Sequence, residues 1–186
     1  MYTIIAGTNR PGSNTLKVAK QYQSIFMANG IEAAVLSLEN LNVFAKNAQF
    51  EKIENEVLIP TQNFIFITPE YNGSFPGVLK MMFDISKSHK IWWHKKALIT
   101  GVSTGRAGNL RGNDHLASIL NYLKITVHPN LLPISSLDTL MDAAGNIIEP
   151  NTLIAINLQI DEFIGWTAKK KPVELKDSRD ILEPTI

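Results

Sequence analysis

Residues 7–15 combine two glycines with short polar side chains directly after an apolar segment, reading Gly-Thr-Asn-Arg-Pro-Gly-Ser-Asn-Thr. Between a strand and a helix, backbone N–H groups and the positive end of the helix attract anions. The side chains of this loop add further donors, one of them charged: Thr8, Arg10, Ser13, Asn14 and Thr15. A helix cap needs only one such residue, so the pattern favours a phosphate site over a simple N-capping loop.

The arrangement of this loop excludes two common kinds of phosphate site. A Walker loop requires Lys directly after the second glycine, where Ser13 stands. The dinucleotide fingerprint G-x-G-x-x-G does not follow the first apolar segment either. A phosphate monoester, such as that of a mononucleotide, is therefore the remaining candidate ligand.

Two other glycine-containing polar segments, 69–74 and 103–112, also follow apolar runs. In the first, Tyr71 could stack on a flat ring while Gly73 allows close backbone approach, although Asn-Gly is equally typical of a turn. The second segment is also compatible with a plain flexible connection. Loops that follow parallel strands leave the same edge of a sheet, so we expect all three to form one site.

Strand-like and helix-like patterns alternate between these loops. Short apolar runs predict strands at 1–6, 31–38, 64–68, 96–102 and somewhere within 125–135. Helical spacing predicts helices near 16–26, 51–58, 76–88, 116–123 and 151–166. The alternation predicts an α/β fold, a doubly wound five-stranded parallel sheet in a three-layer α/β/α arrangement. We expect one domain over 1–168 and a charged C-terminal tail over 169–186.

Composition narrows the class of protein further. The 186 residues include 18 Lys+Arg and 17 Asp+Glu, so the net charge is +1, which disfavours a nucleic-acid binder. The absence of cysteine excludes disulfides, thiolate catalysis and cysteine-based metal sites. His89 and His94 fit no common metal pattern, so no metal is expected. No membrane-spanning or leader-like segment is found, which leads us to expect a soluble cytoplasmic protein.

Two of these segments resemble one family. Residues 7–15, together with the run Pro-Glu-Tyr-Asn-Gly-Ser-Phe-Pro-Gly-Val-Leu-Lys at 69–80, resemble the NAD(P)H-dependent FMN reductases, and the resemblance extends over about 1–166. That family has a flavodoxin-like fold and includes quinone, azo-dye and chromate reductases. Thr8 replaces a serine that is usual in the family and keeps the hydroxyl group.

The resemblance implies a role for each loop. The FMN phosphate would be held by Thr8, Arg10, Ser13, Asn14 and Thr15. The flavin ring would be contacted, largely through backbone groups, by Pro69, Glu70, Tyr71, Asn72, Gly73 and Ser74. Its other edge would be lined by Ser103, Thr104, Gly105, Arg106 and Gly108. Asn109 stands where relatives often have a second glycine, a departure that affects the third loop.

The implied reaction is hydride transfer from NADPH or NADH to bound FMN, then transfer of two electrons to a quinone, free flavin, azo compound or similar small acceptor. The cofactor carries such chemistry, so we name no catalytic acid, base or nucleophile. Arg106 and Arg111 are candidates to stabilise reduced flavin or to meet the 2′-phosphate of NADPH. The alternatives are a flavodoxin-like FMN-binding electron carrier, which tends to be strongly acidic, and a binding protein without redox activity.

The family also implies an oligomer, a homodimer or homotetramer. Independently, the predicted helix 76–88 is apolar on several sides, as expected for a helix covered by a second subunit. On this interpretation Met82 would lie in the subunit interface.

Overall fold

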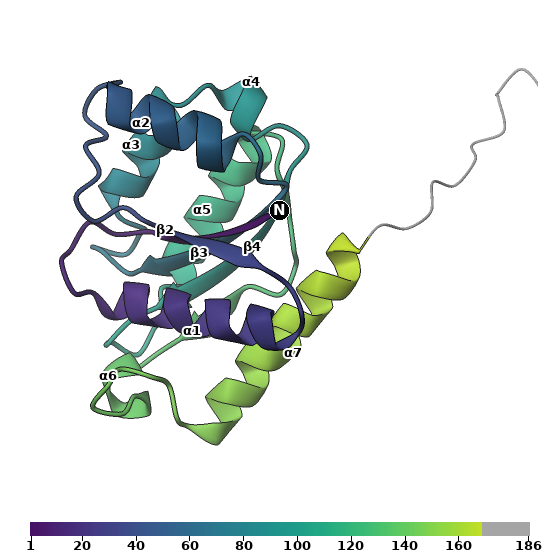
Figure 1. The fold of residues 1–186 in the computed structure, drawn as a ribbon. Coiled ribbons are helices and arrows are strands. Elements are labelled where there is room, and N and C mark those ends of the chain that lie inside the picture. The colour runs from purple at the N-terminus through teal and green to yellow at the C-terminus, as the bar shows by residue number, and fades with distance from the viewer. Residues whose placement is uncertain (169–186) are drawn as a thin grey trace, which may run out of the picture.

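A computed structural model describes residues 1–168 of the chain, and the predicted tail at 169–186 lies outside the described residues. One parallel sheet forms the middle of three layers (Figure 1). Its strands are β1 (Tyr2–Ala6), β2 (Ala33–Ser37), β3 (Asn63–Pro69), β4 (Lys96–Val102), β5 (Thr126–Val127) and β6 (Leu132–Ile134). The order is β2-β1-β3-β4-β5, with β6 also pairing with β4, which confirms the flavodoxin-like doubly wound sheet.

Helices cover both faces of this sheet. One face packs against α1 (Asn14–Ala28), α6 (Leu137–Leu140) and α7 (Pro150–Thr167). The other packs against α2 (Ala48–Ile53), the π-helical turn η1 (Glu54–Leu58), α3 (Gly77–Ile85), α4 (Ser88–Ile91) and α5 (Leu110–Tyr122). Because β1, β3 and β4 are buried on both faces, their apolar residues do not alternate with polar ones.

The structure corrects three predictions about individual elements. The helix expected at 51–58 begins at Ala48 and continues as the π-helical turn. The helix expected at 76–88 ends at Ile85 and is followed by the short α4. Met82, expected at a subunit interface, is fully buried in the core of its own chain, so it cannot contact a second copy in this fold.

The predicted fifth strand is divided by Pro129, which has no N–H to donate to a neighbouring strand. β5 pairs with β4 at Lys96 and Ala97, and β6 pairs with it from Thr100 onward. In the gap, the Gln159 side chain of α7 donates to the Ile99 and Asn130 carbonyls at 3.0 and 2.8 Å. A buried amide therefore takes the place of the missing strand hydrogen bonds.

The Gln159 amide also attaches α7 to α1, which covers the same face of the sheet. Its Oε1 accepts hydrogen bonds from the Tyr22 hydroxyl of α1 at 2.8 Å and from Thr100 of β4 at 2.9 Å. Burial raises the pKa of the Tyr22 phenol above its usual range, so the hydroxyl remains a neutral donor. Every polar atom of Gln159 is thus paired in a fully buried position.

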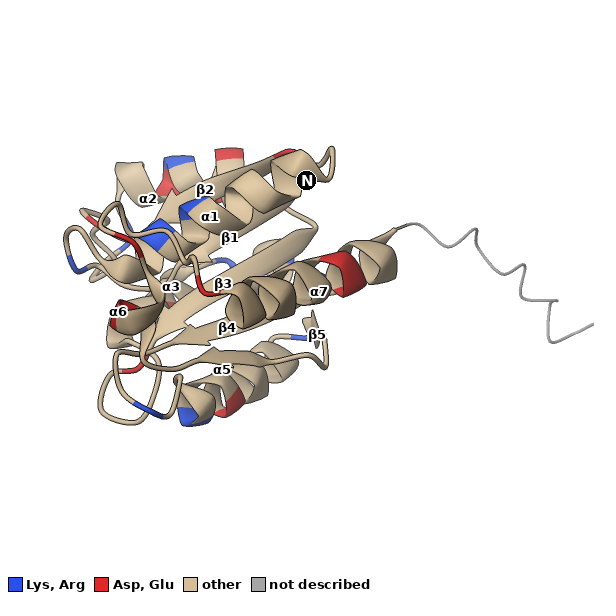
Figure 2. Ribbon diagram, turned by 90° about the horizontal axis from the view of Figure 1, so that it is seen from below, with Lys and Arg blue, Asp and Glu red and all other residues tan. Residues whose placement is uncertain are grey.

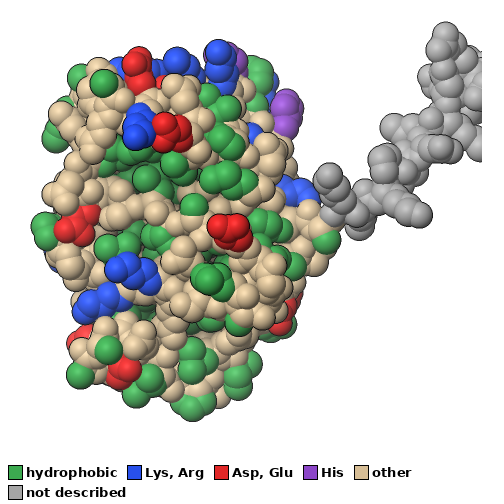
Figure 3. All heavy atoms as spheres, in the orientation of Figure 1, with side chains coloured by type: hydrophobic (Ala, Val, Ile, Leu, Met, Phe, Trp, Pro, Cys, Tyr) green, Lys and Arg blue, Asp and Glu red, His purple; other side chains and the backbone are tan. Residues whose placement is uncertain are grey.

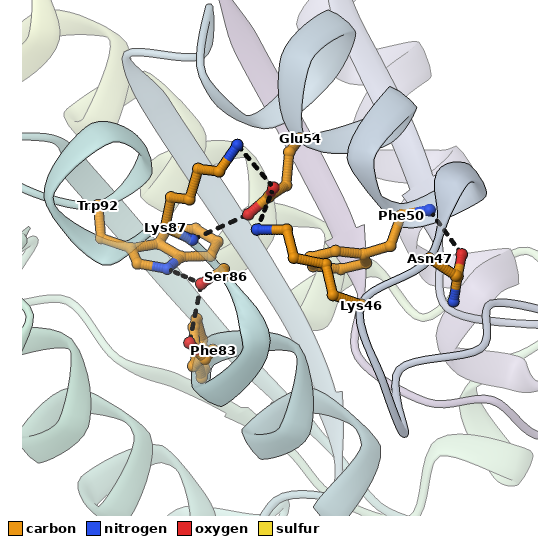
Figure 4. A network of polar contacts seen from close by, with 8 residues as sticks. All are labelled: Lys46, Asn47, Phe50, Glu54, Phe83, Ser86, Lys87 and Trp92. Atoms are coloured by element: carbon orange, nitrogen blue, oxygen red, sulfur yellow. Dashed lines mark hydrogen bonds and ion pairs between the residues drawn. The ribbon is translucent and has the colours of Figure 1, made fainter.

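Glu54 organises the helices on the other face of the sheet (Figure 4). Its side chain is fully buried, and its carboxylate lies 2.8 Å from Lys46 Nζ and accepts the Lys87 N–H at 2.8 Å. Next to it, Trp92 donates to the Ser86 hydroxyl at 2.7 Å. One buried carboxylate therefore joins the segment before α2 to the turn between α3 and α4.

Charges of both signs are scattered over the helices rather than gathered in one patch (Figures 2 and 3). Over residues 1–168, no helix combines the length and apolar character needed to span a bilayer.

Replacing Gln159 with Met should destabilise the protein by about 3 kcal/mol, because four buried polar groups lose a partner while the side-chain volume is nearly kept. Urea denaturation gives this value directly. Asn157→Met, at an exposed position of the same helix, is the control and should change stability by less than about 0.5 kcal/mol. Equal effects of the two substitutions would contradict the role assigned to Gln159.

Candidate functional site

The three polar loops meet at one edge of the sheet. Strand register aligns Ala6 with Ile67 and Pro69 with Val102, so β1, β3 and β4 end side by side. The loops enclose a cavity of about 150 Å³. It is lined by Thr8, Arg10, Ser13, Asn14, Thr15, Pro69, Glu70, Tyr71, Val102, Ser103, Thr104 and Leu137. The predicted convergence is therefore present in the folded chain.

The first loop leads into α1 and presents the start of that helix to the cavity. Ser13 is the N-cap, and its hydroxyl accepts the Leu16 N–H at 3.2 Å. The first N–H groups of a helix have no intrahelical partner, so they are available to an anion. The loop is thus both a helix cap and a set of donors, and the two interpretations of its sequence are compatible.

Thr8 and Arg10 tie this loop to the second one. The hydroxyl groups of Thr8 and Tyr71 lie 2.8 Å apart, and the Arg10 N–H donates to the Thr8 hydroxyl at 3.3 Å. The Arg10 guanidinium lies 5.2 Å from the centre of the Tyr71 ring, within cation–π distance. Tyr71 therefore serves as a support for the guanidinium at the cavity.

The second loop divides into a cavity wall and a tight hairpin. Tyr71 and Ser74 exchange backbone hydrogen bonds at 2.8 and 3.1 Å. Between them, Asn72 and Gly73 have φ of 52° and 74°, as in a type I′ turn. Asn72, Gly73 and Ser74 are not among the lining residues, and the Ser74 hydroxyl instead lies 3.0 Å from His115 Nδ1 of α5.

The third loop contributes Ser103 and Thr104 to the cavity, whereas Gly105, Arg106 and Gly108 lie outside its lining. The Ser103 hydroxyl accepts the Gly105 N–H at 2.9 Å, and the Gly105 carbonyl accepts the Ser136 N–H at 2.9 Å. Arg106 is exposed to solvent.

Val102 and Leu137 line the cavity without having been predicted. Val102 ends a buried strand, so its apolar character indicated a core position alone. Leu137 belongs to α6, a four-residue helix too short to produce a helical pattern in the sequence. Ser136 and Leu137 donate their N–H groups to the Gly105 and Ser103 carbonyls of the third loop at 2.9 and 3.0 Å, and these contacts hold Leu137 at the cavity.

The cavity combines hydroxyl groups, a helix N-terminus, one guanidinium and one carboxylate. Guanidinium, hydroxyl and backbone N–H donors of this kind are suited to an anion. Within the described residues, no group of three or more His, Asp or Glu side chains could hold a metal ion.

Fold and cavity together define a flavodoxin-like protein with a polar cavity at the carboxyl ends of its strands. Residues 2–138 match the NADPH-dependent FMN reductase family, and the chain belongs to that family. It is 30% identical over 176 residues to an NAD(P)H-dependent FMN reductase of Pseudomonas aeruginosa, with 89% of this chain and 94% of that protein covered. It is 24% identical over 177 residues to a 2-hydroxy-1,4-benzoquinone reductase of a Burkholderia species, covering 90% and 96%.

Solved structures agree on the fold. The flavoenzyme FerB of Paracoccus denitrificans, an NAD(P)H:(acceptor) oxidoreductase, is similar with a TM-score of 0.77 and 20% identity, covering 89% of this chain and 95% of that one. An archaeal flavodoxin is similar with a TM-score of 0.60 and 13% identity, covering 87% and 95%. Family membership confirms the predicted enzyme class, an oxidoreductase that uses FMN and NAD(P)H.

Proposed function

We propose that the protein oxidises NAD(P)H at FMN bound in the cavity and passes two electrons to a quinone, free flavin, azo compound or similar small acceptor. The observation that carries this proposal is the convergence of three loops on one cavity whose donors match a phosphate at one end. When bound, FMN supplies the two-electron chemistry. The protein's own residues bind it, orient it and exclude water.

The phosphate of FMN fits the first loop. Thr8, Arg10, Ser13, Asn14 and Thr15 all line the cavity around the start of α1. At about 150 Å³, the cavity is smaller than the ~300–1,000 Å³ of pockets that enclose a whole ligand. It is therefore too small to enclose FMN completely, so part of the flavin ring would extend beyond it along the sheet edge.

The other two loops would hold the ring. Pro69, Glu70 and Tyr71 form one wall of the cavity, and Ser103 and Thr104 form a second wall. We propose that these residues contact the cofactor directly. The remaining predicted residues lie outside the lining of the cavity: Asn72, Gly73, Ser74, Gly105, Arg106 and Gly108.

We also propose that the protein is a homodimer or homotetramer. α3 keeps the partly buried apolar residues Val78, Met81 and Ile85 at the surface of the chain. These positions, rather than the buried Met82, are suited to contact a second subunit.

The pure protein, reconstituted with FMN, should oxidise NADPH or NADH in the steady state when a quinone or free FMN is supplied. The absorbance of the nicotinamide at its long-wavelength band measures the rate. FMN binding without nicotinamide oxidation would instead identify an electron carrier. Failure to bind FMN from excess would identify a protein without redox activity.

Arg10→Ala should weaken binding of FMN by about tenfold, because a charge-assisted contact to phosphate is worth about 1.5–3 kcal/mol. Binding of riboflavin, which lacks the phosphate, should be unchanged. Quenching of flavin fluorescence gives both affinities. Lys20→Ala removes the same charge from an exposed position of α1 and should leave both affinities unchanged. Equal losses for FMN and riboflavin would remove the phosphate role of Arg10.

Arg106→Ala should reduce kcat/KM for NADPH more than for NADH, because we propose that the exposed Arg106 guanidinium meets the 2′-phosphate. Steady-state rates with both donors test this, with Arg111→Ala as the comparison. Equal losses with the two donors would exclude recognition of the 2′-phosphate by Arg106.

A further inference from the structure

Asn109 occupies a position that disfavours an asparagine side chain for three separate reasons. Its φ of 63° lies in the left-handed region, where glycine is unstrained. Its Oδ1 is fully buried and, within residues 1–168, has no hydrogen-bond partner, an arrangement that costs stability. It also requires glycine at 112, since a Cβ there would collide with the Asn109 carboxamide, although glycine weakens a helix interior.

The Asn109 side chain does not offset this loss of stability by capping α5. Asn109 is the N-cap of α5, yet it makes no side-chain cap hydrogen bond, in contrast to Ser13 at the start of α1. Its Nδ2 instead reaches across to β3 and donates to the carbonyl and the hydroxyl of Thr68 at 3.1 and 3.0 Å. Its backbone N–H donates to Glu70 Oε2 at 3.2 Å.

The backbone before Asn109 is fixed from the other side. A Cβ at Gly101 of β4 would collide with the Gly108 carbonyl, and a Cβ at Gly108 would lie 2.8 Å from Pro133 Cβ and 2.9 Å from Ile134 N. The end of the third loop therefore packs closely between β4 and β6. Asn109 completes the attachment by joining it to β3.

We propose that Asn109 is a positioning residue of the flavin site, whose carboxamide attaches the loop after β4 to the end of β3 and so sets the gap between the two walls that hold the ring. The inference rests on the function proposed above. One wall, Pro69 and Glu70, directly follows the Thr68 groups that Asn109 binds. The other wall, Ser103 and Thr104, belongs to the loop that ends at Asn109. A flat ring between them is held tightly only if their separation is fixed.

Asn109→Gly tests the tie without straining the backbone, because glycine adopts the left-handed conformation freely. It should weaken binding of both FMN and riboflavin by about tenfold, since two hydrogen bonds between the walls are lost. The melting temperature of the flavin-free protein should fall by less than that of Gln159→Met, because removing a buried unpaired oxygen offsets part of the two lost hydrogen bonds. Asn40→Gly, at an exposed position with φ of 62°, is the matched control and should leave flavin affinity unchanged.

Gly112→Ala provides an independent test. Its methyl group must displace the Asn109 carboxamide, so it should weaken flavin binding about as much as Asn109→Gly does. In the double variant Asn109→Gly/Gly112→Ala, the collision is absent and no further loss of affinity is expected. A general disturbance of α5 would instead add to the loss already caused by Asn109→Gly.

The proposal is supported if Asn109→Gly lowers the affinity for both FMN and riboflavin, and if the losses caused by Asn109→Gly and Gly112→Ala do not add in the double variant. Affinity of Asn109→Gly within about twofold of the wild type, or additive losses in the double variant, would overturn it. Either of these results would leave the proposed function intact as long as the wild-type protein binds FMN and oxidises NAD(P)H. A wild-type protein that binds no flavin would overturn the proposed function and this inference together.

Discussion

The parallel pairing of β3 with β4 is the interaction on which the site depends. The two strands run in register from Asn63 and Lys96 to Pro69 and Val102, and the Glu70 N–H continues the ladder to the Val102 carbonyl at 3.2 Å. Both strands are buried on both faces, so neither can slip without exposing apolar residues to water. The loops that follow them consequently leave the sheet at the same height, and both line the cavity.

Side chains then join the loops that the sheet has brought together. The Gly7 N–H bonds to the Ile67 carbonyl at 2.8 Å, and the paired hydroxyls of Thr8 and Tyr71 connect the first loop to the second. The Asn109 N–H of the third loop donates to Glu70 of the second, and the Asn109 side chain donates to Thr68 at the end of β3. These contacts are made within the chain itself, and loops held in this way cost less to order on binding. An enzyme whose cofactor supplies the chemistry requires this kind of fixed geometry more than it requires a catalytic side chain.

Two buried side-chain amides, those of Gln159 and Asn109, each join backbone segments that lie apart in the sequence. Gln159 supplies the hydrogen bonds that the strand broken at Pro129 cannot make, and all of its polar atoms are paired. Asn109 spans a gap between two loops and leaves Oδ1 without a partner in the described part of the chain. The first arrangement is what stability alone would favour. The second occurs beside the cavity, where unpaired buried groups and strained backbone are commonly found in enzymes.

The sequence by itself determined the fold class, the approximate positions of the main strands and longer helices, and most of the residues that line the cavity. Long apolar runs and the polar loops after them are local features, so Thr8, Arg10 and Tyr71 could be identified directly. Leu137, the divided fifth strand and the burial of Met82 were decided by tertiary structure, since each depends on residues far away along the chain. The contact between Asn109 and Thr68 likewise could not be predicted from the sequence, because this hydrogen bond forms only after β3 and β4 have paired.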